Sequence, residues 1–229
     1  MSFAVNYHRW ILARLKPFLG SRIVEVGAGR GAFSELLLET GPEALTVLEP
    51  SANMYPLLLE KLAAIDKEHV AQARQCTLAQ ASVNFAEAFP LPDSVLYINV
   101  LEHIEDDEAE LRAAHALLTA GGHVLIFVPA NRWLTGSIDR QLGHFRRYTM
   151  DELTIKCRSA GFRIRLAVHF DFFGIAPWWL KFCVLKSDRL TPGAVRLYDR
   201  CVVPFARMLE RAIPPPIGKN VIVAGEKLA

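Results

Sequence analysis

Cysteine is scarce in this sequence, and the few cysteines are scattered. The 229 residues include four of them and no Cys-x-x-Cys pair; they are Cys76, Cys157, Cys183 and Cys201. This usage argues against a disulfide framework and a cysteine-rich zinc site, and it is typical of reduced, mostly buried thiols. We therefore expect a cytoplasmic protein.

Long apolar runs and a strong net charge are also missing. No run of about twenty uncharged apolar residues occurs, so a membrane-spanning helix is not predicted. The first residues carry Asn6, His8 and Arg9, which does not match a signal peptide. A net charge of +2 does not suggest nucleic-acid binding. Because 52% of the residues are hydrophobic, the chain suits one globular domain over residues 1–229.

Three glycines stand together in a stretch that predicts a strand, a tight turn and a helix. Residues 22–26 are apolar and β-branched apart from Arg22 and Glu25, which suits a parallel strand covered on both faces. Gly27, Gly29 and Gly31 lack a Cβ atom, so they permit a tight turn and a close approach of the backbone to a ligand. A ligand over this turn meets unpaired N–H groups at a helix N-terminus.

Two acids make this stretch more specific. The pattern Glu-x-Gly-x-Gly-x-Gly differs from the Gly-x-Gly-x-x-Gly fingerprint of dinucleotide-binding sites. Glu25 at the end of the strand repels a diphosphate and attracts an ammonium group. Glu49 ends a second predicted strand, over residues 44–49, and a carboxylate there can accept both hydroxyls of a ribose.

Together, the glycine turn, Glu25 and Glu49 resemble the class I S-adenosylmethionine-dependent methyltransferases. The resemblance implies S-adenosyl-L-methionine as cofactor and S-adenosyl-L-homocysteine as product, and no metal is expected. It also implies that Glu87 lies near the adenine and that the backbone at Asn99 and Val100 flanks the methionine part. Met54, which follows Glu49, is expected beside the adenine, with packing in the core as an equal alternative. The implied cofactor-binding residues are Glu25, Gly27, Ala28, Gly29, Gly31, Glu49, Pro50, Met54, Glu87, Asn99 and Val100.

Alternating strand and helix patterns predict an α/β fold with a doubly wound, mostly parallel sheet and right-handed crossovers. The resemblance adds seven strands in a Rossmann-like sheet, with an antiparallel last strand and a helical insert before it. It also implies that a helix within residues 1–20 lies over the cofactor site, although packing on the sheet is an equal alternative. The expected strands are 22–26, 44–49, 81–85, 94–100, 123–128, 162–170 and 220–225. The expected helices are 3–18, 32–40, 51–64, 107–118 and 150–160.

A long loop, residues 129–148, follows the fifth predicted strand. Residues 142–149 read Leu-Gly-His-x-Arg-Arg-Tyr-Thr, which resembles a group of methyltransferases related to the ubiquinone-biosynthesis type. His144 in this loop can take a proton from a hydroxyl or an amine, and His103 after the fourth strand is the second candidate base.

The same loop offers groups that can bind the substrate. Arg146 and Arg147 can hold a carboxylate or phosphate, and Tyr148 lies beside them in the sequence. The alternative is that the arginines pair with acids such as Asp139 or Glu102 and only fix the loop.

About fifty residues, 171–219, separate the last two predicted strands and predict a helical cap over the cleft. The aromatic residues of this insert, Trp178 among them, indicate an apolar substrate or packing on the sheet. A third alternative is peripheral contact with a membrane surface through Trp178, Trp179, Lys181 and Lys186.

These features favour methyl transfer to an oxygen or nitrogen atom of a small, partly apolar molecule. The two rival functions are a nicotinamide-dependent oxidoreductase and a non-catalytic domain that binds a partner or a membrane. The glycine spacing and Glu25 speak against the first rival. The sequence leaves the acceptor molecule and the oligomeric state open.

Overall fold

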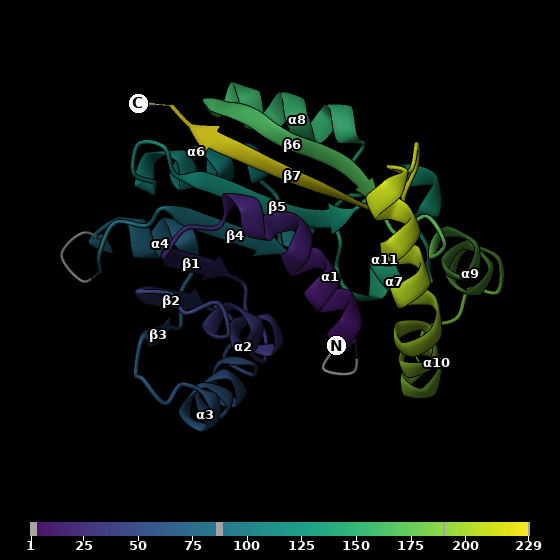
Figure 1. Ribbon diagram of the computed structural model, residues 1–229, viewed down its shortest axis with the longest axis horizontal. Helices are drawn as coiled ribbons and strands as arrows, with labels where there is room; N and C mark the ends of the chain where they lie inside the picture. Colours follow the sequence, from purple (N-terminus) through teal and green to yellow (C-terminus); the bar gives the residue numbers. More distant parts are fainter. Residues whose placement is uncertain (1–3, 86–88, 190, 229) are drawn as a thin grey trace.

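A seven-stranded sheet forms the centre of the computed structural model, which describes residues 4–85, 89–189 and 191–228 (Figure 1). The strand order is β3-β2-β1-β4-β5-β7-β6, with β7 antiparallel to both of its neighbours and the other pairs parallel. This arrangement confirms the predicted fold class. The strands are β1 Arg22–Val26, β2 Ala44–Leu48, β3 Ala71–Arg74, β4 Ser94–Ile98, β5 His123–Pro129, β6 Phe162–Phe170 and β7 Asn220–Lys227.

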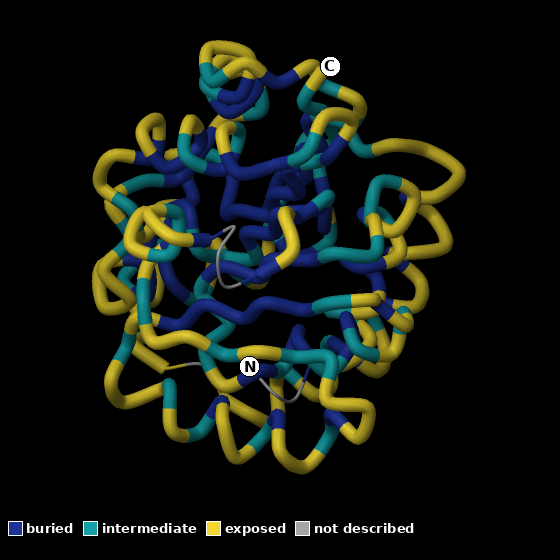
Figure 2. The backbone as a smooth tube through the Cα atoms, turned by 90° about the vertical axis from the view of Figure 1, so that its left-hand side faces the viewer, coloured by how far each residue is buried: buried dark blue, intermediate teal, exposed yellow. Residues whose placement is uncertain are grey.

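Helices cover both faces of the sheet, so that its strands are buried in the middle (Figure 2). One layer contains α1 Val5–Leu15, α2 Ala32–Leu38, α3 Tyr55–Ile65 and α11 Val203–Ala212, and the other contains α4 Leu78–Ser82, α6 Asp107–Leu117 and α8 Met150–Ser159. The shorter helices are α7 Ser137–Gln141, α9 Ile175–Trp178 and α10 Pro192–Leu197. Among the helices that the structure describes, none is long and apolar enough to cross a membrane.

Alternation along β1 decides which side chains reach each layer. Val24 and Val26 belong to the core beneath α4, α6 and α8, whereas Ile23 belongs to the core beneath α1, α2 and α3. Because successive side chains of a strand point to opposite faces, Glu25 lies on the side of Ile23 and faces α2. The buried acid is therefore placed by the same alternation that forms the two cores.

Two predicted helix starts are confirmed by their capping side chains. The Asp106 carboxylate accepts a hydrogen bond from the backbone N–H of Ala109 at 2.9 Å at the start of α6. The Thr149 hydroxyl accepts one from the N–H of Glu152 at 3.1 Å at the start of α8. Each cap satisfies a backbone donor that the helix leaves unpaired.

The third strand was predicted in the wrong place. Residues 81–85 contain the end of α4, and the strand lies earlier, at β3. Thr77 and Gln80 form a capping box that starts α4, and this box was not recognised in the sequence. The helix expected at residue 51 begins at Tyr55, because residues 52–54 form a turn first.

The insert between β6 and β7 is fastened by a buried acid. Asp171 has no exposed surface, and its carboxylate accepts hydrogen bonds from the hydroxyls of Tyr7, at 2.9 Å, and Tyr198. The Nζ atom of Lys219 lies 2.7 Å from the same carboxylate. Asp171 therefore links α1, the insert and the start of β7. In Figure 1, α9, α10 and α11 lie together at the end of the sheet toward which β4 and β5 point.

A second acid of the insert caps α1. No side chain next to α1 in the sequence caps its first turn. The Asp199 carboxylate instead accepts hydrogen bonds from the backbone N–H groups of Asn6 at 3.2 Å and Tyr7 at 2.8 Å. The N-terminal helix therefore depends on residues that lie almost two hundred positions later in the chain.

Replacing this cap should destabilise the protein. Asp199→Ala should lower the free energy of unfolding by about 1–3 kcal/mol, because two N–H groups at the helix start lose their acceptor. Urea unfolding at neutral pH measures this change. Asp188→Ala is the matched control. Asp188 is an exposed acid of the same insert, and its ion pair with Arg189, at 3.9 Å, lies on the surface. Equal midpoints for the two variants would contradict the capping role.

Candidate functional site

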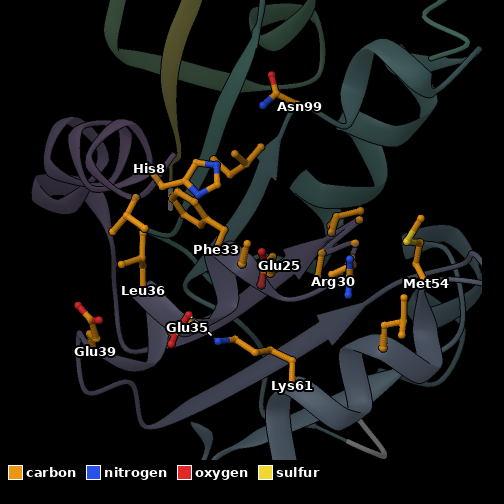
Figure 3. A pocket seen from close by; sticks show the side chains of 18 of the residues that line it. His8, Glu25, Arg30, Phe33, Glu35, Leu36, Glu39, Met54, Lys61 and Asn99 are labelled. Carbon is orange, nitrogen blue, oxygen red and sulfur yellow. Dashed lines mark ion pairs between the residues drawn. The ribbon is translucent and has the colours of Figure 1, made fainter. Parts of the chain in front are cut away.

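A cavity of about 890 Å³ opens at the carboxyl end of β1. The turn after β1, α1, α2, α3 and the end of β4 all contribute to its wall. Figure 3 shows Glu25 between Phe33 and Arg30, with His8 on the side of Phe33, Met54 on the side of Arg30 and Asn99 above them. Ligands of doubly wound sheets bind at this edge.

Steric constraints require glycine at two positions of the turn after β1. Gly27 has a φ of +67°, and a Cβ atom there would lie 2.7 Å from a methyl carbon of Val100. Gly31 has a φ of +76°, and a Cβ atom would lie 2.9 Å from Leu58. Gly29 also has a positive φ, +58°, but its missing side chain would point into open space. At Gly29 the absence of a side chain therefore leaves room beside the backbone.

Glu49 holds the glycine turn against the next strand. One carboxylate oxygen of Glu49 accepts a hydrogen bond from the N–H of Gly29 at 2.6 Å, and the other accepts one from the N–H of Ser51 at 2.8 Å. Glu49 is 6% exposed. A carboxylate has about four lone-pair sites, so two bonds leave acceptor capacity for the hydroxyls of a ligand.

Glu25 is a buried carboxyl group with one hydrogen-bonding partner among the described residues. The hydroxyl of Ser34 on α2 donates to it at 2.5 Å. Burial raises the pKa of Glu25 to about 7; the Ser34 bond lowers it, and the negative charge of Glu49 raises it further. A cationic neighbour strongly stabilises the ionised form of such a carboxyl group, because the positive charge offsets the cost of its burial.

The remaining predicted cofactor residues lie at different distances from the cavity. Ala28, Met54 and Asn99 line it, whereas Val100 packs behind Gly27. Pro50 is exposed, and Glu87 lies outside the described residues. Residues that line the cavity but were not predicted include Val5, His8, Arg30, Phe33 and Leu36. The helical spacing of 32–40 signalled Phe33 and Leu36. The helix expected within residues 1–20 contains His8, although its pattern did not single out that residue.

The two candidate bases lie next to each other. The rings of His103 and His144 meet edge to face, with centroids 4.6 Å apart. The Nδ1 atom of His144 lies 2.9 Å from a carboxylate oxygen of Asp139, which orients the ring. Partial burial and the neighbouring His144 lower the pKa of His103, so that His103 is neutral at pH 7.

Glu102 stands beside this pair without a partner of its own. It has no exposed surface, and neither carboxylate oxygen makes a hydrogen bond to any described residue. Burial raises the pKa of Glu102 to about 8. Possible ligand atoms of Glu102, His103 and His144 lie within 4.8 Å of one another. These three residues are therefore able to hold a divalent metal ion, although no metal was expected from the sequence.

The arginines of the loop are already paired. Arg147 is buried and donates two hydrogen bonds to Asp139, at 2.9 and 3.1 Å, while its guanidinium group lies 4.9 Å from the ring centre of Trp178. Arg146 pairs with Asp107 at 2.8 Å, and the buried hydroxyl of Tyr148 donates to the same acid at 2.7 Å. These contacts favour the alternative in which the arginines fix the loop.

The paired groups also change the expectation for substrate binding. Arg147 and Tyr148 have almost no exposed surface, so their polar atoms do not face a ligand. Trp178 is half-buried, and its ring N–H donates to the carbonyl of Leu134 at 3.1 Å. Arg147 and Trp178 bind the loop and the insert to each other, whereas Arg146 and Tyr148 bind the loop to Asp107 of α6.

Comparison with known proteins identifies the family of this chain. A family model described as a methyltransferase domain matches residues 5–167. The ubiquinone biosynthesis O-methyltransferase of Ruegeria pomeroyi is 32% identical over 110 residues, which cover 47% of this chain and 40% of that protein. The protein of the same name from Azotobacter vinelandii is 25% identical over 168 residues, covering 68% and 69%. An S-adenosylmethionine-dependent methyltransferase from Mesorhizobium loti has a TM-score of 0.61 at 17% identity, covering 98% of each chain.

The sheet order and the antiparallel β7 define the fold as that of the class I S-adenosylmethionine-dependent methyltransferases. The chain belongs to the methyltransferase domain family. The resemblance seen in the glycine turn is thereby confirmed, together with S-adenosyl-L-methionine as the cofactor of the family. The matched segment spans less than half of the Ruegeria relative, so the substrate does not transfer with the family.

The pKa of Glu25 predicts how pH affects cofactor binding. S-adenosylhomocysteine should bind more tightly as pH rises from 6 to 8, by about tenfold, because its ammonium group favours the ionised carboxylate. Below pH 7, Glu25 has to lose a proton when the ligand binds, and above pH 7 the affinity should level off. Isothermal titration calorimetry across this range measures the change. Glu25→Gln should remove the pH dependence, and a flat profile for the unmodified protein would contradict this role of Glu25.

Proposed function

We propose that this protein transfers a methyl group from S-adenosylmethionine to an oxygen or nitrogen atom of a small, partly apolar molecule. The observation that carries the proposal is that the glycine turn with its two acids and His103 lie at the carboxyl ends of adjacent strands, β1, β2 and β4, where His144 from the loop after β5 meets His103. This arrangement supports a cofactor site and a proton acceptor at the same end of the fold.

The residues of the cavity fit the cofactor in charge and in shape. Glu25 lines the cavity and would hold the ammonium group. Glu49 does not line the cavity itself, but it is bonded to the N–H of Gly29, which does, and it would hold the ribose hydroxyls. Both are buried carboxyl groups with free acceptor capacity. The open backbone at Gly29 leaves space for the ligand. When bound, the cofactor supplies an electrophilic methyl group on its sulfonium atom, so the chemistry is largely its own. What the protein adds is orientation and exclusion of water.

The histidine pair provides a base where the acceptor needs to lose a proton. With Nδ1 of His144 held by Asp139, the Nε2 atom is left as the proton acceptor, and this atom is on the side of the ring away from Asp139. The edge-to-face contact keeps His103 beside it. The relatives from Ruegeria pomeroyi and Azotobacter vinelandii are named O-methyltransferases, which supports an oxygen acceptor.

Two measurements test the function as a whole. The protein should bind S-adenosylhomocysteine and should not bind NADH, which separates methyl transfer from the rival oxidoreductase. The protein should then move a labelled methyl group from the cofactor onto a small molecule of a cell extract, detected by mass spectrometry. Tight binding of NADH without binding of S-adenosylhomocysteine would refute the proposal.

Removing the carboxylate of Glu49 should weaken cofactor binding. Glu49→Ala should cost about 1–3 kcal/mol of binding free energy for S-adenosylhomocysteine, because buried hydroxyls lose their acceptor and the turn at Gly29 loosens. Calorimetric titration measures the loss, and circular dichroism checks that the variant is folded. Glu43→Ala, an exposed acid just before β2, is the control and should bind as the unmodified protein does. Unchanged affinity in folded Glu49→Ala would remove Glu49 from the site.

Removal of the base should lower the rate of methyl transfer and leave cofactor binding unchanged. His144→Ala should lower kcat/KM for a hydroxyl acceptor by about 10²–10⁴-fold, the usual contribution of a positioned base. Its affinity for S-adenosylhomocysteine should be unchanged. His123→Ala is the control, because His123 begins β5 at the opposite edge of the sheet. If His144→Ala and His103→Ala both keep the full rate, orientation alone accounts for catalysis.

A further inference from the structure

The insert exposes an unusual share of the apolar surface. Of the twenty large apolar side chains that are exposed within the described residues, ten belong to the insert, although it is only about a fifth of the chain. These ten are Phe172, Trp179, Leu180, Val184, Leu185, Leu197, Phe205, Met208, Leu209 and Ile213. A concentration of this kind indicates a surface that something else covers.

The helix α11 shows how this surface is built. Its protein-facing positions recur at helical spacing and are Val203, Ala206 and Glu210. Phe205, Met208 and Leu209 also recur at helical spacing, but they form a second apolar stripe that is exposed. Arg207 and Arg211, one turn apart, form a basic row on the remaining side of the helix. The outward half of α11 is thus part apolar and part basic.

Ring contacts extend the stripe beyond α11. The ring of Phe205 lies 5.6 Å from that of Phe173, and Phe173 lies 5.5 Å from Phe172, which is 43% exposed. We refer to Phe172, Phe205, Arg207, Met208, Leu209 and Arg211 as the α11 face. It lies at the end of the sheet toward which β4 and β5 point (Figure 1).

Most acidic residues of the insert are buried, whereas most of its basic residues are on the surface. Three of its four acids, Asp171, Asp199 and Glu210, are buried and bound to groups of the protein. Lys219 pairs with Asp171, but the other basic residues stand outside. Four of them make no ion pair with any described residue; they are Lys186, Arg200, Arg207 and Arg211. The outer surface of the insert is therefore positive, although the protein as a whole is near neutral.

We propose that the α11 face docks on a bilayer that contains anionic phospholipids. An apolar stripe beside a basic row on one helix is the arrangement that places a helix in the plane of a membrane interface. Each basic side chain near an anionic surface adds attraction. A second copy of this chain is a poorer occupant, because two positive faces repel each other. Trp178 is not part of the face, because its ring packs between Arg147 and Lys219.

Docking does not depend on methyl transfer, but it suits an apolar acceptor. The insert lies at the same edge of the sheet as His103 and His144, so an acceptor dissolved in the bilayer would have a short path to the site. Binding to vesicles and binding of S-adenosylhomocysteine are separate measurements. Failure of one leaves the other proposal standing.

Sedimentation of the full chain with vesicles tests the docking. The chain should bind vesicles of phosphatidylcholine with phosphatidylglycerol at least about tenfold more tightly than vesicles of phosphatidylcholine alone, and added salt should weaken the binding. The double variant Arg207→Glu with Arg211→Glu should lose at least about tenfold in partition. Phe205→Ser with Met208→Ser should lose about tenfold on the same vesicles. These side chains are exposed, so the variants should fold.

Matched changes elsewhere serve as controls. Leu59→Ser on α3 and Arg158→Glu on α8 alter exposed residues of the same kinds and should leave vesicle binding unchanged. All variants should keep the affinity for S-adenosylhomocysteine of the unmodified chain. Absence of binding to anionic vesicles at low salt, or an equal loss in the controls, would overturn the proposal. So would a dimer in solution that the α11 variants convert to monomers without any vesicle binding.

Discussion

The hydrogen bond between Glu49 and the N–H of Gly29 is the constraint on which the candidate cofactor site depends. It joins the end of β2 to the turn after β1, so two neighbouring strands share one loop geometry. The turn can take this shape only because Gly27 and Gly31 have positive φ angles and would clash with a Cβ atom. Glu25 then faces the cavity because alternation along β1 places it beside Ser34. The shape of the turn after β1 and the position of Glu25 thus follow from one local arrangement of β1 and β2.

Buried acids organise the rest of the molecule in a similar way. Asp139 receives Arg147 and His144, so the same carboxylate fixes the loop and orients the ring of the candidate base. Asp171 and Asp199 attach the insert to α1 and to β7. Because these acids are occupied inside, four basic residues of the insert make no ion pair with any described residue; they are Lys186, Arg200, Arg207 and Arg211. The positive face and the internal anchoring of the insert are therefore two results of the same distribution of charge.

Much of the fold could be predicted from the sequence, because most of its signals are local. Apolar runs marked β1, β2, β4 and β5, and the structure confirms the helix starts expected at residues 107 and 150. The third strand could not be predicted in this way, since Ala71–Arg74 alternates alanine with polar residues and lacks β-branched side chains. Of the site, the glycine turn and both acids were predictable from spacing. The pairing of Arg147 with Asp139 and the position of His8 depend on tertiary contacts between distant segments, which spacing does not reveal.

The attachment of α1 limits how far the cavity can widen. His8 on α1 forms part of the cavity wall, while the first turn of the same helix is held by Asp199 in the insert. A displacement of α1 that widens the cavity must stretch or break those bonds, and so must disturb the insert. The width of the cavity and the position of the insert are therefore mechanically coupled through one helix.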